Sequence, residues 1–344
     1  MKRKDYLDVA KLFSVLCVIY IHSATTDSAI RYTITAFFMP VFFIIYGFAS
    51  SKKPLKSGKE ICSFVLNRGK SLLVPYVLWA MIYAGSIDIN FIINVVIGNN
   101  LSLGRAETNM VLWFLPCMFV SVLLFQVYIN LSSFIANKYY KLGFSILAAV
   151  ICGVISCIFN GFEQGGRVFG VDIAFTGCVF MIIGEYFGIL VNFWKEKPFY
   201  VKMIGGMAGM LLTYGIACLN IPYLEQIGYK RVIMARAIYG RYDLFIVGGV
   251  VGSFAMLLIA MIFERVRLFV YMGRFSLVIM AVHHLLFPYV KPLCNAILDI
   301  KYGDIIYPAA VSLCCFVICI PLCFIIDWAV PELNGKSMRM QQMK

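Results

Sequence analysis

The stretch DVAKLFSVLCVIYIHSA, residues 8–24, is a nearly unbroken apolar run that nevertheless carries three ionisable side chains, Asp8, Lys11 and His22. A transmembrane helix needs about 20 mostly apolar residues, and this run with its flanks meets that length. Ionisable groups are costly in lipid and are kept there mainly where they have a task. The run therefore predicts a first transmembrane helix that carries candidate functional residues.

Apolar runs of similar length recur along the whole chain of 344 residues, which is 62% hydrophobic and only 14% charged. Soluble domains average about 45–50% apolar and about 25% charged residues, so this excess needs lipid as its solvent. We predict an all-α polytopic membrane protein of about ten transmembrane helices, a single transmembrane domain over residues 1–344 without a soluble domain. The predicted spans are 8–24, 33–50, 71–87, 110–133, 143–159, 172–192, 203–221, 243–263, 275–290 and 305–326, and the short apolar stretch 88–98 is expected at the membrane interface.

The net charge of +13 is carried by short segments between the apolar runs. With a cytoplasmic N-terminus, 20 of the 30 Lys and Arg residues fall on the inner side and nine on the outer side, which predicts both termini inside. The outer segment 222–242 breaks the trend with four basic residues. Either the number of predicted helices is wrong before this segment, or the positive charge of the loop has a function on the outer side, such as holding an anionic substrate.

The same sequence argues against several other classes of protein. No basic stripe with interleaved aromatic residues is present, so we expect no nucleic-acid partner. The twelve cysteines lie mostly inside apolar runs and include no C-x-x-C pair, as expected of packing residues. Phosphate-loop, nucleophile-elbow and H-E-x-x-H patterns are also missing. We therefore expect no metal.

Lys11 and His22 share one face of the first predicted helix. Their separation of eleven residues is close to three helical turns, about 16 Å along the axis. Asp8, one turn before Lys11, can pair with it. A neutral imidazole is a suitable general base near pH 7, so this face could bind an anionic cofactor at Lys11 and move a proton at His22. The structural alternative is that His22 caps the helix at the lipid interface and Lys11 extends its ammonium to the inner surface.

The Lys11-x10-His22 spacing resembles the N-terminal Arg/Lys-x10-His signature of the acyltransferase-3 family, multi-pass membrane proteins that mostly O-acetylate sugars of the cell envelope. Further stretches resemble later motifs of that family in the same order and cover residues 5–285 together. They are FFMPVFFIIYGFASSKK (37–53), FVLNRGKSLLVPYVLW (64–79), WFLPCMFV (113–120), DIAFTGCVFMIIGEYFG (172–188) and GRFSLVIMAVH (273–283).

The resemblance implies roles for several histidines and cations. His22 would be the catalytic histidine and Lys11 its basic partner facing acyl-CoA. His283 matches the family's late histidine. His284 points about 100° away from it around a helix, so only one of the two is expected to face a given pocket.

The inner-side Arg-x-x-Arg element of the family is matched only in part. Arg68 occupies its first position, but Ser71 stands at the second, with Lys70 beside it. Lys70 could act there as a point charge, but it cannot offer the bidentate fork of an arginine. The expected contacts to CoA phosphates come from Lys11, Arg68, Lys70 and Arg274.

The resulting expectation is an O-acyltransferase of the bacterial cytoplasmic membrane. It would move an acyl group, expected to be acetyl, from cytoplasmic acyl-CoA to a hydroxyl of an envelope saccharide or lipid-linked saccharide. Membrane lipids are the other expected partners, and a homo-oligomer is left open. The alternative is a transporter for a small polar solute such as an amino acid, because related membrane domains occur fused to vancomycin-resistance serine racemases.

Overall fold

The structure, a computed structural model, describes residues 4–84, 89–98, 111–162, 168–297, 303–304 and 306–336. Within them the regular structure is helical, apart from one isolated antiparallel bridge between Ile233 and Ile238. Nine helical segments of this described part are long and apolar enough to cross a membrane. The protein is therefore an all-α polytopic membrane protein, as predicted.

Nine of the ten predicted spans coincide with these segments, and their ends differ by at most six residues. The second span is broken after Phe37 into two consecutive helices, and the second of them begins at Pro40. The predicted span 71–87 lies mostly in α4 (Gly58–Ala84), a helix with a charged first half that is not among the nine, and its last residues are outside the described part. The stretch 88–98 holds α5 (Ile89–Ile97), which is too short to cross.

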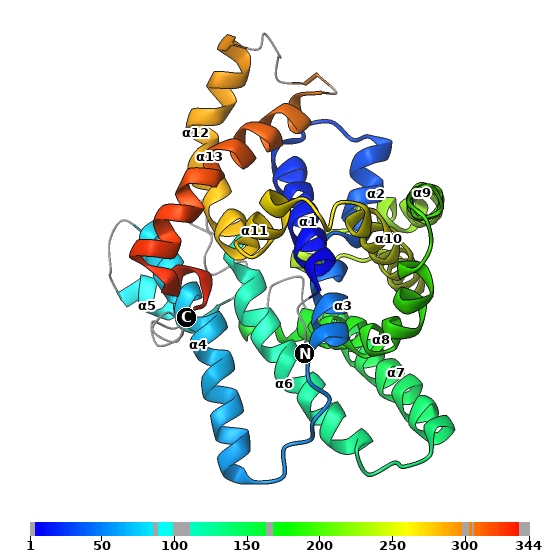
Figure 1. Cartoon of the computed structure of the whole chain (residues 1–344). Helices are drawn as coiled ribbons and strands as arrows, with labels where there is room; N and C mark the ends of the chain where they lie inside the picture. Colours follow the sequence, from blue (N-terminus) through cyan, green and yellow to red (C-terminus); the bar gives the residue numbers. More distant parts are fainter. Residues whose placement is uncertain are drawn as a thin grey trace. The chain divides into compact units, whose positions relative to one another are not determined.

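The chain divides into two compact units. The first comprises Met1–Ile45, Phe187–Ile233 and Ile238–Trp328. Its first helix is central, because α1 contacts α2, α10, α11 and α12 (Figure 1). The helices of this unit are α1 (Asp5–Ser23), α2 (Ala29–Phe37), α9 (Phe199–Glu225), α10 (Tyr242–Ile262), α11 (Arg267–Gly273), α12 (Ser276–Ile297) and α13 (Tyr307–Ala329).

The second unit comprises Tyr46–Tyr186, Met234–Ala237 and Ala329–Lys344. In it α4 packs against α6 and against the short helix η4. Its elements are α4, α5, α6 (Phe114–Ser132), α7 (Lys138–Phe162), η2 (Val168–Gly170), η3 (Met234–Arg236) and η4 (Pro331–Asn334), while α3 (Pro40–Ala49) and α8 (Val171–Lys195) each contribute to both units. The expectation of a single domain stays a prediction.

Burial separates helices that face lipid from helices that face protein. In α7 only 17% of the membrane-length window is buried, and Ile146, Leu147 and Val150 are exposed along it. Apolar side chains in that number need lipid to cover them. In α1 the corresponding share is 61%, although this helix carries Asp8, Lys11 and His22. The costly ionisable groups thus belong to a helix that is largely enclosed by protein, as expected of functional groups.

Candidate functional site

Three histidines meet where the last turn of α1 approaches α12. The ring centroids of His22 and His283 are 5.4 Å apart, those of His22 and His284 4.8 Å, and those of the two neighbours 4.6 Å. The prediction that only one of His283 and His284 can face a common site is therefore wrong. Their side chains diverge by about 100° around the helix, but the ring of His22 lies within reach of both.

His283 is held in one orientation and keeps one nitrogen available. The residue is fully buried, and its Nδ1 lies 2.6 Å from the carbonyl oxygen of Met280. A carbonyl can only accept a hydrogen bond, so Nδ1 carries the hydrogen and, in the neutral ring, Nε2 carries the lone pair. This Nε2, like that of His284, is buried and has no hydrogen-bond partner among the described residues. The cluster therefore offers at least one ring nitrogen with an unpaired acceptor position, the Nε2 of His283.

The same cluster has the composition of a metal site, which the sequence did not indicate. One ligand nitrogen from each histidine lies within 4.8 Å of the others. Two nitrogens bound to one zinc ion at about 2.1 Å each can be at most about 4.2 Å apart, so the spacing is near the limit of what an ion can bridge. The cations around the cluster, described below, add an electrostatic cost to binding a divalent ion.

A buried carboxylate, that of Asp8, lies near the N-terminal end of α1. Asp8, with a side chain only 3% exposed, pairs with Lys11 at 3.2 Å and with Arg274 at 3.7 Å. The predicted pairing of Asp8 with Lys11 is confirmed. Gly273 makes the second contact possible, because α11 approaches α1 so closely that a Cβ at this position would collide with the carbonyl group of Asp8. Arg274, the next residue, is thereby held beside the carboxylate.

A basic pocket of about 870 Å³ opens at the N-terminal end of α1. Its lining brings together five cations and two acids from four segments of the first unit. The cations are Lys4, Lys195, Arg265, Arg267 and Arg274, and the acids are Asp5 and Glu264. Of the predicted cofactor contacts, the pocket lining includes Arg274, whereas Lys11 is not among the lining residues and pairs with Asp8.

The pocket concentrates positive charge in a partly buried place. Burial, and after it the charge of Lys195, lower the pKa of the Lys4 ammonium below its usual value. A bound anion would relieve that repulsion, so the pocket is suited to a ligand with several negative charges. Nothing in the sequence unites Lys4, Lys195, Arg265 and Arg267, whose only shared signal is that each lies a few residues outside a predicted span.

Comparison with known families decides the identity of the chain. The sequence model of the acyltransferase-3 family, described as an acyltransferase domain, matches residues 4–328. The chain belongs to this family. It is an acyltransferase, and the transporter alternative receives no such support. A search of curated proteins found no match, and a search of solved structures found none.

Two further predicted contacts of the acyltransferase, Arg68 and Lys70, lie on α4 in the second unit. The guanidinium of Arg68 stacks over the rings of Tyr46, at 5.5 Å, and Phe64, at 5.2 Å. Lys70 is exposed, and it points about 200° away from Arg68 around the helix. The two cations thus point to nearly opposite sides of α4, and a role of Lys70 in place of the second arginine, where Ser71 stands, stays a prediction.

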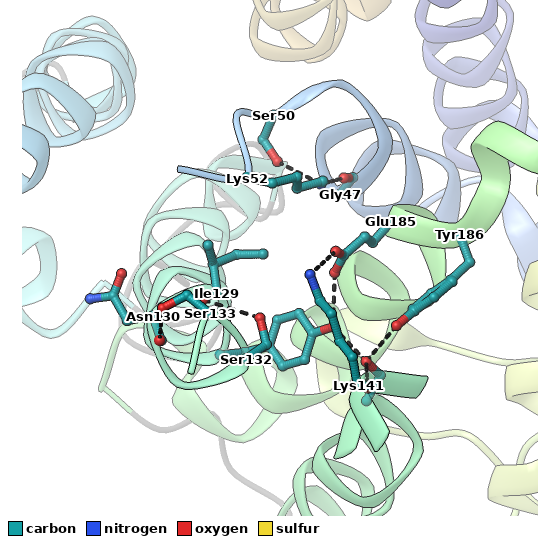
Figure 2. A network of polar contacts seen from close by, with 12 residues as sticks. Gly47, Ser50, Lys52, Ile129, Asn130, Ser132, Ser133, Lys141, Glu185 and Tyr186 are labelled. Carbon is teal, nitrogen blue, oxygen red and sulfur yellow. Dashed lines mark hydrogen bonds and ion pairs between the residues drawn. The ribbon is translucent and has the colours of Figure 1, made fainter. Parts of the chain in front are cut away.

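The second unit of the acyltransferase also contains a polar network that the sequence pattern does not indicate (Figure 2). Glu185 pairs with Lys141 at 3.5 Å and accepts a hydrogen bond of 2.8 Å from Tyr128. Tyr128 and Tyr186 both reach the hydroxyl of Ser145, at 2.7 and 2.6 Å.

Lys52 lies at the edge of this network. Its ammonium donates to the carbonyl of Gly47 and lies 4.9 Å from the centre of the Phe125 ring. Burial lowers the pKa of Lys52 to about 8, an effect that the Glu185 carboxylate opposes and the Lys141 ammonium reinforces. The network thus holds a lysine that can lose its charge near physiological pH.

Proposed function

We propose that this acyltransferase transfers an acetyl group from cytoplasmic acetyl-CoA to a hydroxyl of an envelope saccharide at the bacterial cytoplasmic membrane. The observation that carries the proposal is that one helix, α1, leads from the basic pocket at its start to the histidine cluster at its end. This arrangement suits a donor that is charged at one end and reacts at the other. It also allows the acceptor to approach from the opposite side of the membrane.

The basic pocket is the proposed docking site for the nucleotide part of CoA. The 3′-phosphate and the diphosphate of CoA carry several negative charges, which match the cluster of Lys4, Lys195, Arg265, Arg267 and Arg274. Arginine forks bind phosphate through two parallel hydrogen bonds, and the lysines add attraction without that geometry. Lys11 acts here as a positioning residue, because with Arg274 it balances the buried carboxylate of Asp8.

His22 is the proposed general base, about 16 Å farther along α1 from Lys11. The neutral imidazole takes the proton of the acceptor hydroxyl while the hydroxyl oxygen attacks the thioester carbonyl. The carbon–sulfur bond then breaks, and the CoA sulfur leaves with the proton returned by the imidazolium. The products are an acetyl ester and free CoA. His283, held by Met280, supports His22 through its fixed orientation in the cluster.

The proposal is tested with the purified full-length protein, labelled acetyl-CoA and a panel of sugar acceptors. The wild type should release free CoA and label a sugar. His22→Ala should lower kcat by about 10²- to 10⁴-fold, the usual contribution of a general base, while acetyl-CoA still binds. Unchanged transfer by His22→Ala would remove this histidine from the mechanism.

The proposed donor site can be tested with two nearby lysines, one inside the pocket and one outside it. Lys195 lines the basic pocket, whereas Lys197 lies over the ring of Phe193, with its ammonium 4.4 Å from the ring centre. Lys195→Gln should raise the KM for acetyl-CoA about five- to thirty-fold, corresponding to the loss of about 1–2 kcal/mol of charge-assisted binding. Lys197→Gln should leave the KM within twofold. Equal effects of the two variants would place the donor elsewhere.

A further inference from the structure

Positive charge exceeds negative charge in the loop that follows the histidine end of α1. Asp27, five residues after His22, accepts contacts on the same oxygen, Oδ1, from Arg31 at 3.5 Å and from Arg231 at 3.4 Å. One carboxylate therefore serves two guanidinium groups, which leaves a net charge of +1 on the three side chains. Arg231 belongs to the outer segment 222–242, the one that departs from the predicted charge bias.

Arg31 is buried without a full set of partners. Its side chain is 9% exposed, and its Nε has no hydrogen-bond partner among the described residues. The contacts of its Nη1, to the Thr26 carbonyl at 3.3 Å and to Asp27, are long. A guanidinium offers five donors, and leaving even one of them, here the Nε hydrogen, unmet in a buried place costs free energy that a ligand could recover. An oxyanion is the ligand that such a fork binds best.

These cations lie close enough to the histidine cluster for the charges of Arg231, Lys291 and Arg31 to act on His22. Lys291 belongs to α12, and its ammonium lies 4.4 Å from the centre of the Phe287 ring. That ring in turn contacts both His283 and His284, at centroid distances of 5.4 and 5.0 Å. Positive side chains from α2, the 222–242 segment and α12 therefore converge on the place where the acceptor must react.

We propose that the acceptor carries an anionic group, a carboxylate or a phosphate ester, which Arg31, Arg231 and Lys291 bind beside His22. This inference rests on the proposed function and specifies its substrate class. A sugar acid and a lipid-linked sugar phosphate share the oxyanion that these cations would recognise. The same positive surroundings make a divalent metal in the histidine cluster unfavourable.

The test measures equilibrium binding to the purified full-length protein in nanodiscs, independently of acetyl transfer. The probes are glucose, glucuronate and glucose 6-phosphate, and a separate arm adds a polyprenyl phosphate to the nanodisc lipids. The wild type should bind an anionic probe at least tenfold more tightly than glucose. Preference for glucuronate or glucose 6-phosphate points to a charged sugar, whereas preference for the polyprenyl phosphate alone points to the lipid-linked phosphate.

The variants separate this site from general surface charge. Arg231→Gln and Arg31→Gln should reduce the preference for the anionic probe to within about twofold of glucose. Arg241→Gln is the matched control, since Arg241 lies in the same outer segment but pairs with Asp243 at 2.9 Å, and it should keep the preference. Arg231 is partly exposed, so its replacement tests the proposal even if the buried Arg31 proves necessary for folding.

Three outcomes would overturn the inference. They are equal binding of neutral and anionic probes, an anionic preference that survives both Arg31→Gln and Arg231→Gln, and stoichiometric binding of Zn²⁺ that depends on His22. None of them bears on acetyl-CoA consumption, which is measured separately. If acetyl-CoA is consumed while the anionic preference is missing, the proposed function stands and only the substrate class is wrong.

Discussion

The ring of His22, at the end of α1, lies 5.4 Å from the ring of His283 on α12, although 261 positions separate the two residues in the chain. The two rings differ in their surroundings. His283 is fully buried and bound at Nδ1 by the Met280 carbonyl, whereas His22 is exposed at the end of its helix. A buried, fixed imidazole beside a more accessible one suits a pair in which the first orients the second.

Replacing His283 should therefore impair catalysis without impairing donor binding. We expect His283→Ala to lower kcat about tenfold to a hundredfold and to leave the KM for acetyl-CoA within twofold, because the ring acts at the reacting end of α1. As a positioning residue it should also shift the pH profile of kcat, since His22 would lose a neighbouring imidazole. Steady-state kinetics between pH 5 and 9 provide the measurement.

His284→Ala is the control for this prediction. His284 is also close to His22, but its Nε2 has no hydrogen-bond partner among the described residues, and its side chain is partly exposed. We expect a smaller loss of kcat than in His283→Ala, whereas the pH profile should shift in this variant too, because His22 again loses a neighbouring imidazole. Equal losses of kcat in the two variants would show that the Met280 contact has no part in the mechanism.

Local relationships of this protein could be read from its sequence, and relationships between distant segments could not. Nine predicted spans and the pairing of Asp8 with Lys11 were found because span length and helical spacing depend only on nearby residues. The family resemblance pointed to His283, but the joint approach of His283 and His284 to His22 depends on how two helices cross. Here the argument from a single helix gave the wrong answer.

The basic pocket illustrates the same limit. Its cations come from the start of α1, the end of α8 and the region of α10 and α11, so no motif in the sequence unites them. The tight approach of α11 to α1 at Gly273 is likewise invisible as a pattern, because a single glycine in an apolar stretch has many uses. The excess of basic residues in the outer segment 222–242 could be seen in the sequence. The sequence did not show that the buried Arg31 shares the carboxylate of Asp27 with Arg231 of that segment.

Removing the charge of Asp8 should destabilise the protein. Asp8→Asn leaves Lys11 and Arg274 facing each other over a nearly buried amide, and losing a buried charged partner of this kind costs about 1–3 kcal/mol. We expect a clearly lower melting temperature of the purified protein. We also expect a raised KM for acetyl-CoA, because Arg274 lines the pocket. Thermal unfolding and donor kinetics measure the two effects.

Asp5→Asn is the matched control for Asp8→Asn. Asp5 lies one turn earlier on the same helix and is exposed at the pocket. Its replacement should change the unfolding free energy by no more than about 0.5 kcal/mol, as is usual for surface sites. If both variants have the same melting temperature as the wild type, the ion pairs of Asp8 contribute nothing to the stability of the folded protein.

The buried position of Lys52 predicts a specific dependence of stability on pH. The pKa of Lys52 is about 8 in the folded protein, below the value of 10.5 expected in the unfolded chain. Below pH 8 both states are charged, and the cost of burying the ammonium is fully present. Between about pH 8 and 10.5 the folded protein releases the proton while the unfolded chain keeps it, so the contribution of Lys52 to stability rises with pH.

Melting temperatures of the wild type and Lys52→Met between pH 7 and 10 test this sign. Groups that titrate in both proteins cancel in the difference between their melting temperatures. The melting temperature of the wild type should therefore rise relative to that of the variant as the pH rises through 8. Lys53→Met is the control for removing a neighbouring lysine, because the Lys53 side chain is 75% exposed. Parallel curves for the wild type and Lys52→Met would mean that Lys52 keeps its ordinary pKa.

Gly273 should be intolerant of even one added methyl group. A Cβ there would overlap the carbonyl group of Asp8, which is backbone and cannot rotate away, so Gly273→Ala must push α11 from α1. Overpacking of this kind typically costs about 1–3 kcal/mol, and the displacement should also pull Arg274 from Asp8 and raise the KM for acetyl-CoA.

Gly215→Ala is the control for the added methyl group itself. Gly215 lies on α9 with no atom within 4 Å of the added Cβ, and alanine is the better helix former by up to about 1 kcal/mol. This variant should melt at or slightly above the wild-type temperature with an unchanged KM. A Gly273→Ala protein that matched it in both measurements would show that the close approach of α11 to α1 does not position Arg274.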